Sequence, residues 1–196
     1  MNTEPVLINI CGNIASGKST LVAALKDRFK LPAVSEETSR ISLFDFYCRS
    51  PNMWAGPAQA QFLTDKFARA ISSLVEKATL VDRSFEEDAL IFARMHYDLG
   101  NISDAGFDAY MRMYTGAVDL LPSRKVNILV SCSDEEQVRR IQYRSVREKR
   151  MLSDVYLDAL RLRYRDFARK TNFHFTFNSE NDDIADLIDF VDQTIT

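Results

Sequence analysis

The strongest chemical signal in this chain is a phosphate-binding pattern close to its start. The residues of this pattern, G-x-x-x-x-G-K-S/T with the threonine that follows it, are Gly12, Asn13, Ile14, Ala15, Ser16, Gly17, Lys18, Ser19 and Thr20. In such a loop, backbone N–H groups and the start of the next helix face phosphate oxygens. The ammonium of Lys18 can reach the outer phosphates, and the hydroxyl of Ser19 can bind Mg²⁺. The pattern therefore predicts a site for a nucleoside triphosphate with Mg²⁺.

A second candidate for chemistry is the pair Asp82-Arg83, which ends another apolar run. A carboxylate at this position can hold Mg²⁺ through water, or it can accept a proton from an attacking hydroxyl. The planar guanidinium of Arg83 suits phosphate oxygens and the reacting oxygen. The alternative is that Asp82 only caps the following helix. We take both residues as candidate catalytic groups, with Asp82 also a candidate metal ligand.

Two further carboxylates, Glu36 and Glu37, follow a short strand-like segment. One of them is expected to face the same cleft and could act as general base while Asp82 serves the metal, or the two roles could be reversed. The alternative is that both are solvated loop charges.

An arginine-rich segment, Arg139–Arg150, suggests a lid over the phosphates. On a helix, Arg140, Arg144 and Arg147 share one face through their i+4 and i+3 spacing. Such a row can neutralise charge on a transferring phosphoryl group, and we expect a lid over about residues 140–152. A solvated helix face and a nucleic-acid patch are the alternatives. The net charge of −3 and the lack of interleaved aromatic residues argue against nucleic acid.

Polar side chains among aromatic residues suggest a pocket for a nucleobase. Gln59, Lys66 and Asp88 lie in predicted helices that also carry several phenylalanines. An amide or a carboxylate between aromatic faces can read the edge of a base. The two histidines, His96 and His174, show no metal-ligand spacing, and we assign them no role.

The elements that must position these residues alternate between strands and helices. The strand-like segments are Val6–Cys11, Ala33–Ser35, Thr79–Asp82, Val126–Ser131 and Phe173–Phe177. The helical patterns are Leu21–Phe29, Trp54–Lys77, Phe85–Leu99, Asp104–Leu121, Glu135–Lys149, Ser153–Lys170 and Asp182–Thr194. This alternation predicts a parallel sheet covered on both faces. Ligands bind beyond the carboxyl ends of such strands, so the candidate residues are expected to converge there.

The composition predicts one domain over residues 1–196 and a cytoplasmic enzyme. Apolar residues make up 46% of the chain, an ordinary share for a globular protein. The small net charge gives no reason to expect binding to nucleic acid or acidic membranes. Three cysteines cannot all pair with one another, and Cys11 and Cys132 read as core residues in a reducing compartment. No segment reads as a signal peptide or a membrane span.

The order of these motifs resembles the deoxyribonucleoside kinases, and most of all the compact bacterial-type deoxyadenosine/deoxyguanosine kinases. The residues that carry the resemblance are Gly12 to Thr20; Asp45-Phe46-Tyr47, Pro51, Trp54-Ala55, Gln59 and Phe62-Leu63; Asp82 to Ala93; and Arg140, Arg144, Glu148, Tyr156-Leu157 and Tyr164. The resemblance runs from about Ile8 to Phe167. It implies a P-loop NTPase-type three-layer α/β/α fold, with a five-stranded parallel sheet and an arginine-rich helical lid.

The resemblance also implies the reaction, which is transfer of a phosphoryl group from ATP, with Mg²⁺, to the 5′-hydroxyl of a deoxynucleoside. Glu36 would be the base that activates this hydroxyl, Arg83 would bind the hydroxyl, and Asp82 would lie at the metal. Arg140 and Arg144 would bind the phosphates from the lid. The family further suggests a homodimer packed through long helices.

Substrate-binding residues follow from the same resemblance. Tyr47 and Glu148 would hold the 3′-hydroxyl of the sugar. Gln59 would read the base edge with its amide, Phe92 would stack on the base, and Trp54 would line its pocket.

Asp88 and Lys66 match a family pair beside the exocyclic group of the base. A carboxylate accepts a hydrogen bond from an exocyclic amine but repels a thymine carbonyl, so we predict deoxyadenosine, deoxycytidine or deoxyguanosine over thymidine. The chain departs from the family at Glu37, where proline is usual, so Glu36 and Glu37 both remain candidates for the base. The lid register around Arg147 and Glu148 also departs from the usual pattern.

Two other functions are compatible with the phosphate-binding pattern. A nucleoside monophosphate kinase, such as a thymidylate kinase-like protein, would need extra cations for the acceptor phosphate, which Glu36 or Glu37 would oppose. A non-catalytic nucleotide-binding relative could lose Lys18 or Asp82, yet both are present.

Overall fold

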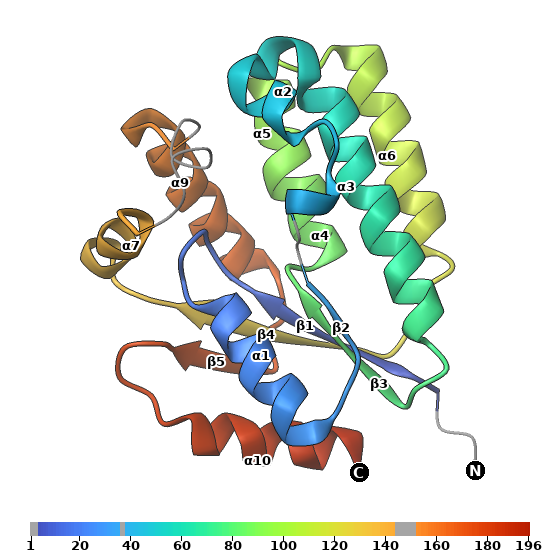
Figure 1. Ribbon diagram of the computed structural model, residues 1–196, viewed down its shortest axis with the longest axis vertical. Helices are drawn as coiled ribbons and strands as arrows, with labels where there is room; N and C mark the ends of the chain where they lie inside the picture. The colour runs from blue at the N-terminus through green and yellow to red at the C-terminus, as the bar shows by residue number, and fades with distance from the viewer. Residues whose placement is uncertain (1–3, 36–37, 144–151) are drawn as a thin grey trace.

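The centre of the fold is a five-stranded parallel sheet (Figure 1). The computed structural model describes residues 4–35, 38–143 and 152–196. The strands are β1 (Val6–Cys11), β2 (Ala33–Val34), β3 (Ala78–Asp82), β4 (Lys125–Ser131) and β5 (Phe175–Asn178). They lie in the order β2-β3-β1-β4-β5, and each pairs with its neighbours in parallel, which confirms the parallel sheet that the alternating pattern predicts.

Strand β1 occupies the middle of the sheet, and all of its side chains are buried. An apolar run that is buried on both faces is typical of a strand covered by helices on both sides. Ile10 of β1 is level with Asp82 of β3 and with Ile128 of β4. This register brings the loop after Cys11 next to the end of β3.

Helices cover both faces of the sheet and form the expected three layers (Figure 1). On one face, α1 (Lys18–Phe29) and α10 (Ile184–Ile195) pack against Ile8 and Ile10. The helices on the other face are α3 (Pro51–Ser73), α4 (Phe85–Glu87), the π-helix η2 (Asp88–Ala93), α5 (Arg94–Asp98), α6 (Asp104–Val118) and α9 (Asp154–Lys170). Within the described ranges, no helix is both long enough and apolar enough to cross a membrane.

The helices differ from the sequence patterns at several points. The short helix α2 (Phe44–Arg49) was not predicted, and α3 begins at Pro51 because proline is favoured in the first turn of a helix. The predicted helix Phe85–Leu99 is continuous but contains η2, and π-helical turns often mark functional sites. The predicted helix Glu135–Lys149 is described as α7 (Asp134–Ile141), and residues 144–151 of the expected lid lie outside the described residues.

A buried carboxylate, that of Glu87, connects three segments of the fold. One oxygen accepts hydrogen bonds from the Gly12 backbone N–H at 2.8 Å and from the Tyr164 hydroxyl at 3.0 Å. The other oxygen accepts from the N–H of Ser84 at 2.7 Å and from its hydroxyl at 3.0 Å. The phosphate-binding loop, the end of β3 and α9 are therefore held to one group.

The position of Glu87 has a local cause as well. Ser84 and Glu87 form a capping box, in which each side chain bonds to the backbone N–H of the other residue. The spacing S-x-x-E after a strand is a signal in the sequence that could have identified Glu87, although it says nothing of the contacts with Gly12 and Tyr164.

Gly12 is required where β1 turns into the loop. Its φ is +145°, and an added Cβ would lie 2.2 Å from the carbonyl oxygen of Val130 in β4. Because the obstructing atom belongs to a central strand, the loop would have to move to admit a side chain.

Gly12→Ala should lower the free energy of unfolding by about 1–3 kcal/mol, since alanine is strained in this backbone conformation. The matched control is Gly116→Ala on α6, where an added Cβ meets nothing within 4 Å. That substitution should raise stability by about 0.5–1 kcal/mol, because it removes a helical glycine. Urea denaturation of both variants measures the difference, and equal effects would contradict the steric argument.

Glu87→Gln should lower the free energy of unfolding by about 3 kcal/mol, because the new amide N–H group must face a donor at Ser84 or at Gly12. The neighbouring Glu86→Gln is the control, since Glu86 is 30% exposed and pairs only with Lys125 among the ion pairs of the described residues. It should change stability by under about 1 kcal/mol. If the two variants unfolded at the same urea concentration, Glu87 would not connect these segments as described.

Candidate active site at the carboxyl ends of the strands

The phosphate-binding loop forms a small polar hollow between β1 and α1. The ammonium of Lys18, at the first position of α1, is buried and donates to the carbonyl oxygen of Asn13 at 2.8 Å. The first N–H groups of a helix have no partner within the helix, so those at the start of α1 are available to a ligand in this hollow. The hollow has a volume of about 190 Å³ and is lined by Ala15, Gly17, Lys18, Ser19, Thr20 and Arg140. A cation and helix N–H groups around one hollow suit phosphate oxygens.

The two predicted metal ligands lie in contact. The hydroxyl of Ser19 donates to a carboxylate oxygen of Asp82 at 2.7 Å. Mg²⁺ is usually bound by one or two protein oxygens together with water and phosphate oxygens, so this pair fits the ion. Among the described residues no group of three or more His, Cys, Asp and Glu side chains could hold a metal.

Arg83 turns away from the direction of β3 because its backbone is left-handed. Its φ is +69°, an uncommon and strained value for a residue other than glycine. The guanidinium carbon lies 3.9 Å from the centre of the Phe92 ring, on η2. Asp82 therefore faces the phosphate loop, while the side chain of Arg83, the next residue, lies over the ring of Phe92.

The buried faces of α3 and η2 bring the predicted base-reading residues together. Gln59 and Lys66 are buried on α3, and Asp88 is buried at the start of η2. The ammonium of Lys66 pairs with the Asp88 carboxylate and donates to the carbonyl oxygen of Arg83 at 2.9 Å. The carboxylate of Asp88 is thus charge-balanced where it is buried, and the Lys66–Asp88 pair is joined to the end of β3.

Tyr47 and Trp54 lie on α2 and α3. Tyr47 is buried, its hydroxyl is 2.6 Å from a ring nitrogen of His96, and burial raises the pKa of its phenol well above the usual range. The positive charge of Arg83 acts on this pKa in the opposite direction, so the two side chains lie near each other. The half-buried Trp54 packs on Phe46 with ring centres 5.2 Å apart.

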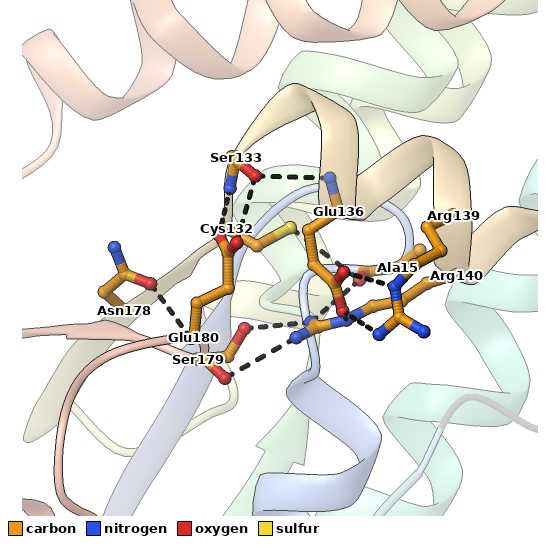
Figure 2. Close-up of polar contacts among 9 residues, drawn as sticks. All are labelled: Ala15, Cys132, Ser133, Glu136, Arg139, Arg140, Asn178, Ser179 and Glu180. Atoms are coloured by element: carbon orange, nitrogen blue, oxygen red, sulfur yellow. Dashed lines mark hydrogen bonds and ion pairs between the residues drawn. The ribbon is translucent and has the colours of Figure 1, made fainter.

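Arg140 lies over the phosphate loop from α7 (Figure 2). Its guanidinium bonds to the carboxylate of Glu136 at 2.7 Å, to the carbonyl oxygen of Ala15 at 3.2 Å and to the hydroxyl of Ser179 at 2.9 Å. Hydrogen bonds from Arg139 and Arg140 lower the pKa of Glu136 to about 2. This network joins α7, the phosphate loop and the connection between β5 and α10.

A second hollow opens beside this network. It has a volume of about 430 Å³, and its lining includes Leu21, Arg139, Phe177, Ser179 and Ile184. Apolar side chains next to a phosphate-binding hollow suit the base of a bound nucleotide.

The structure does not describe every predicted site residue, and it adds residues that were not predicted. The predicted residues Glu36, Arg144 and Glu148, with the alternatives Glu37 and Arg147, lie outside the described residues. The sequence indicates no role for Glu87, His96 or Ser179, yet each contacts a predicted site residue or the loop itself. These contacts join residues far apart in the chain and leave no local pattern, apart from the capping box at Glu87.

Comparisons with known proteins agree with this geometry. The family model described as deoxynucleoside kinase matches residues 8–194. A deoxyadenosine/deoxycytidine kinase from Bacillus subtilis is 26% identical over 164 residues, 82% of this chain and 76% of the relative. A deoxyguanosine kinase from Lactobacillus acidophilus is 25% identical over 177 residues, 85% of this chain and 77% of the relative.

Solved structures show the same fold. A deoxyadenosine kinase from M. mycoides with the products dCMP and dCDP has a TM-score of 0.80 at 23% identity, covering 96% of this chain and 98% of that one. The same enzyme with bound dCTP has a TM-score of 0.77 at 21% identity and the same coverage. With the family match over residues 8–194, the chain belongs to the deoxynucleoside kinase family and is a kinase of deoxynucleosides.

Proposed function

We propose that this kinase transfers the terminal phosphate of ATP, with Mg²⁺, to the 5′-hydroxyl of a deoxyribonucleoside. The observation that carries the proposal is the end of β3. Asp82 contacts Ser19 of the phosphate loop, while the next residue, Arg83, stacks on Phe92 beside the buried Lys66–Asp88 pair. The proposed donor and acceptor sites would therefore meet at two consecutive residues, which is the arrangement that direct phosphoryl transfer needs.

The donor half is the phosphate loop, Gly12 to Thr20. Lys18 would neutralise charge on the outer phosphates, and Arg140 with Arg144 would do so from α7 and the lid. Ser19 and Asp82 would hold Mg²⁺, which supplies charge neutralisation at the transferring phosphate when bound. Relatives of the same fold have been solved with bound dCTP and dATP, which supports a nucleoside triphosphate as the natural ligand of such a loop.

The acceptor half would hold the sugar and the 5′-hydroxyl. Glu36 is the proposed base that takes the 5′ proton, and Arg83 would bind the same hydroxyl and the developing charge. Tyr47, with Glu148, would hold the 3′-hydroxyl. The contact between Arg83 and Phe92 supports this assignment, because it places a cation at the edge of the aromatic pocket that would stack the base.

The base pocket favours an exocyclic amine. The carboxylate of Asp88, which pairs with Lys66, is a hydrogen-bond acceptor that suits a donor on the base, whereas a thymine carbonyl would face it with like polarity. Gln59 would read the base edge beside it, and Trp54 would line the pocket. The relatives are named for deoxyadenosine, deoxycytidine and deoxyguanosine, which supports the same choice here.

We further propose a cytoplasmic homodimer packed through α3 and the α4–η2–α5 helix. Leu90 and Leu99 on that second helix are 50% and 53% exposed, which leaves apolar surface for a partner subunit. Cys11, Cys48 and Cys132 are free thiols, which suits a reducing compartment.

A panel of four deoxynucleosides with ATP and Mg²⁺ tests the substrate. We expect turnover of deoxyadenosine, deoxycytidine or deoxyguanosine to exceed that of thymidine by about tenfold or more, since an unpaired carboxylate–carbonyl contact costs at least about 1.4 kcal/mol. Turnover of each nucleoside should also exceed turnover of its 5′-monophosphate. If thymidine were the best substrate, the proposed preference for a base with an exocyclic amine would be wrong. Faster phosphorylation of a monophosphate would indicate a nucleoside monophosphate kinase.

Asp82→Asn tests the catalytic role of the strand end. It should lower kcat by about 100-fold or more, because the amide neither holds the metal as well nor accepts a proton. The control is Asp119→Asn, an exposed aspartate that follows α6. A fall in kcat of less than about tenfold, or under 1.4 kcal/mol of barrier, would mean that Asp82 does not have this role.

A further inference from the structure

We propose that His96, held by Asn101, is a positioning residue that presents the hydroxyl of Tyr47 as a hydrogen-bond donor to the 3′-hydroxyl of the nucleoside. The inference rests on the proposed function, in which Tyr47 binds the sugar. It adds two residues to that site, and neither of them would touch the substrate.

The contacts of His96 point to this role. The residue lies in α5 and is 1% exposed. Its Nε2 is 2.6 Å from the hydroxyl oxygen of Tyr47, and the two rings meet edge to face at 5.3 Å. Its other nitrogen, Nδ1, is 3.1 Å from the side-chain amide nitrogen of Asn101. Both ring nitrogens therefore have polar partners in a buried place.

These partners determine which nitrogen carries the proton. Burial lowers the pKa of His96 to about 4, so the ring is neutral near pH 7 and has one N–H. An amide nitrogen can only donate, which makes Nδ1 the acceptor and places the proton on Nε2. The Nε2–H group then donates to the oxygen of Tyr47. The phenolic proton of Tyr47 is left to point away from the imidazole.

The surroundings of Tyr47 show where this proton can go. Tyr156 of α9 and the positive charge of Arg83 both act on the Tyr47 hydroxyl, so both side chains lie near it. The ring centre of Tyr156 is 6.3 Å from that of His96. With His96 donating to its oxygen, the phenolic proton of Tyr47 is directed toward Arg83 and Tyr156, where the sugar would lie.

The turn after α5 holds His96 through its backbone too. Gly100 adopts a left-handed φ of +72°, which reverses the chain. The N–H groups of Asn101 and Ile102 then donate to the carbonyl oxygen of His96 at 2.8 Å and 3.2 Å. The side chain of Asn101 returns to the same residue, so backbone and side chain together fix the imidazole.

This link matters because Tyr47 lies on a short helix outside the sheet. The six-residue helix α2 packs mainly on α3, whereas His96 is on the continuous helix that also carries Asp88 and Phe92. The bond from His96 to Tyr47 therefore couples the residue proposed to read the sugar to the helix proposed to read the base.

The test compares the best 2′-deoxynucleoside of the panel with its 2′,3′-dideoxy analogue in the full-length enzyme. His96→Leu should raise KM for the deoxynucleoside about tenfold, with a smaller change in kcat, because one charge-neutral hydrogen bond to the sugar is misplaced. The same variant should change kcat/KM for the dideoxynucleoside by less than about twofold, since that substrate has no 3′-hydroxyl. His96→Gln, whose amide can donate from the position of Nε2, should recover most of the loss.

A second variant tests the direction of the bonds. In Asn101→Asp, the new carboxylate would accept from Nδ1–H and move the ring proton off Nε2. His96 would then accept the phenolic proton of Tyr47, so discrimination between the two substrates should fall as in His96→Leu. Asn101 lies at a half-buried turn, where this substitution is compatible with folding.

Different results test the role of His96, the role of Tyr47 and the kinase activity separately. In a Tyr47→Phe background, His96→Leu should have no further effect on the preference for a 3′-hydroxyl. Equal losses of kcat/KM on both substrates in His96→Leu would overturn the role of His96 alone, provided that Tyr47→Phe lowers kcat/KM more for the deoxynucleoside than for its dideoxy analogue. Equal losses on both substrates in Tyr47→Phe would overturn the sugar assignment of Tyr47 and this inference with it. A wild-type enzyme that phosphorylates none of the deoxynucleosides would overturn the proposed function itself.

Discussion

The buried carboxylate of Glu87 is the point on which the active site depends. It accepts hydrogen bonds from Gly12, Ser84 and Tyr164, and therefore holds the phosphate loop, the end of β3 and α9 at fixed distances from one another. A buried charge is costly unless its oxygens are fully bonded, so the three segments are stable together rather than separately. The pair Asp82-Arg83, which we propose is catalytic, directly precedes Ser84 and takes its position from the same group.

The end of β3 then directs two neighbouring side chains to different parts of the candidate site. Asp82 continues the strand and reaches Ser19, whereas the left-handed backbone of Arg83 sends its side chain to Phe92. Strain of this kind costs about 1–3 kcal/mol and persists only where the surroundings fix the backbone. The N–H group of Arg83 donates to Ile10, and its carbonyl oxygen accepts from Lys66, so both sides of the strained residue are held.

The polar groups of the site lie at one edge of an apolar core. The sheet beneath them buries Leu7, Ile8 and Ile10 completely and packs them against helices on both faces. Burial of such side chains contributes about 1.5–3 kcal/mol each, which can offset the desolvation of Glu87 and of the Lys66–Asp88 pair. The position of the sheet thus allows charged groups to be placed away from water, where their interactions with a transferring phosphate are stronger.

The sequence by itself determined the class of fold and indicated the contiguous parts of the candidate site. Alternating apolar strands and helical patterns are local properties, and so are the loop Gly12 to Thr20 and the pair Asp82-Arg83, so each could be identified from neighbouring residues. The expected α/β architecture and the deoxynucleoside kinase family are confirmed. Short or irregular elements, such as α2 and the π-helix η2, were not predicted because packing rather than local pattern stabilises them.

Only the tertiary structure decided which distant residues support that site. Glu87 meets Gly12 across 75 positions, Tyr47 meets His96 across 49, and Arg140 meets Ser179 across 39. Each contact depends on how helices pack on a sheet and on the requirement that buried polar groups find partners. The spacing of residues along the chain predicts neither the packing nor the partners.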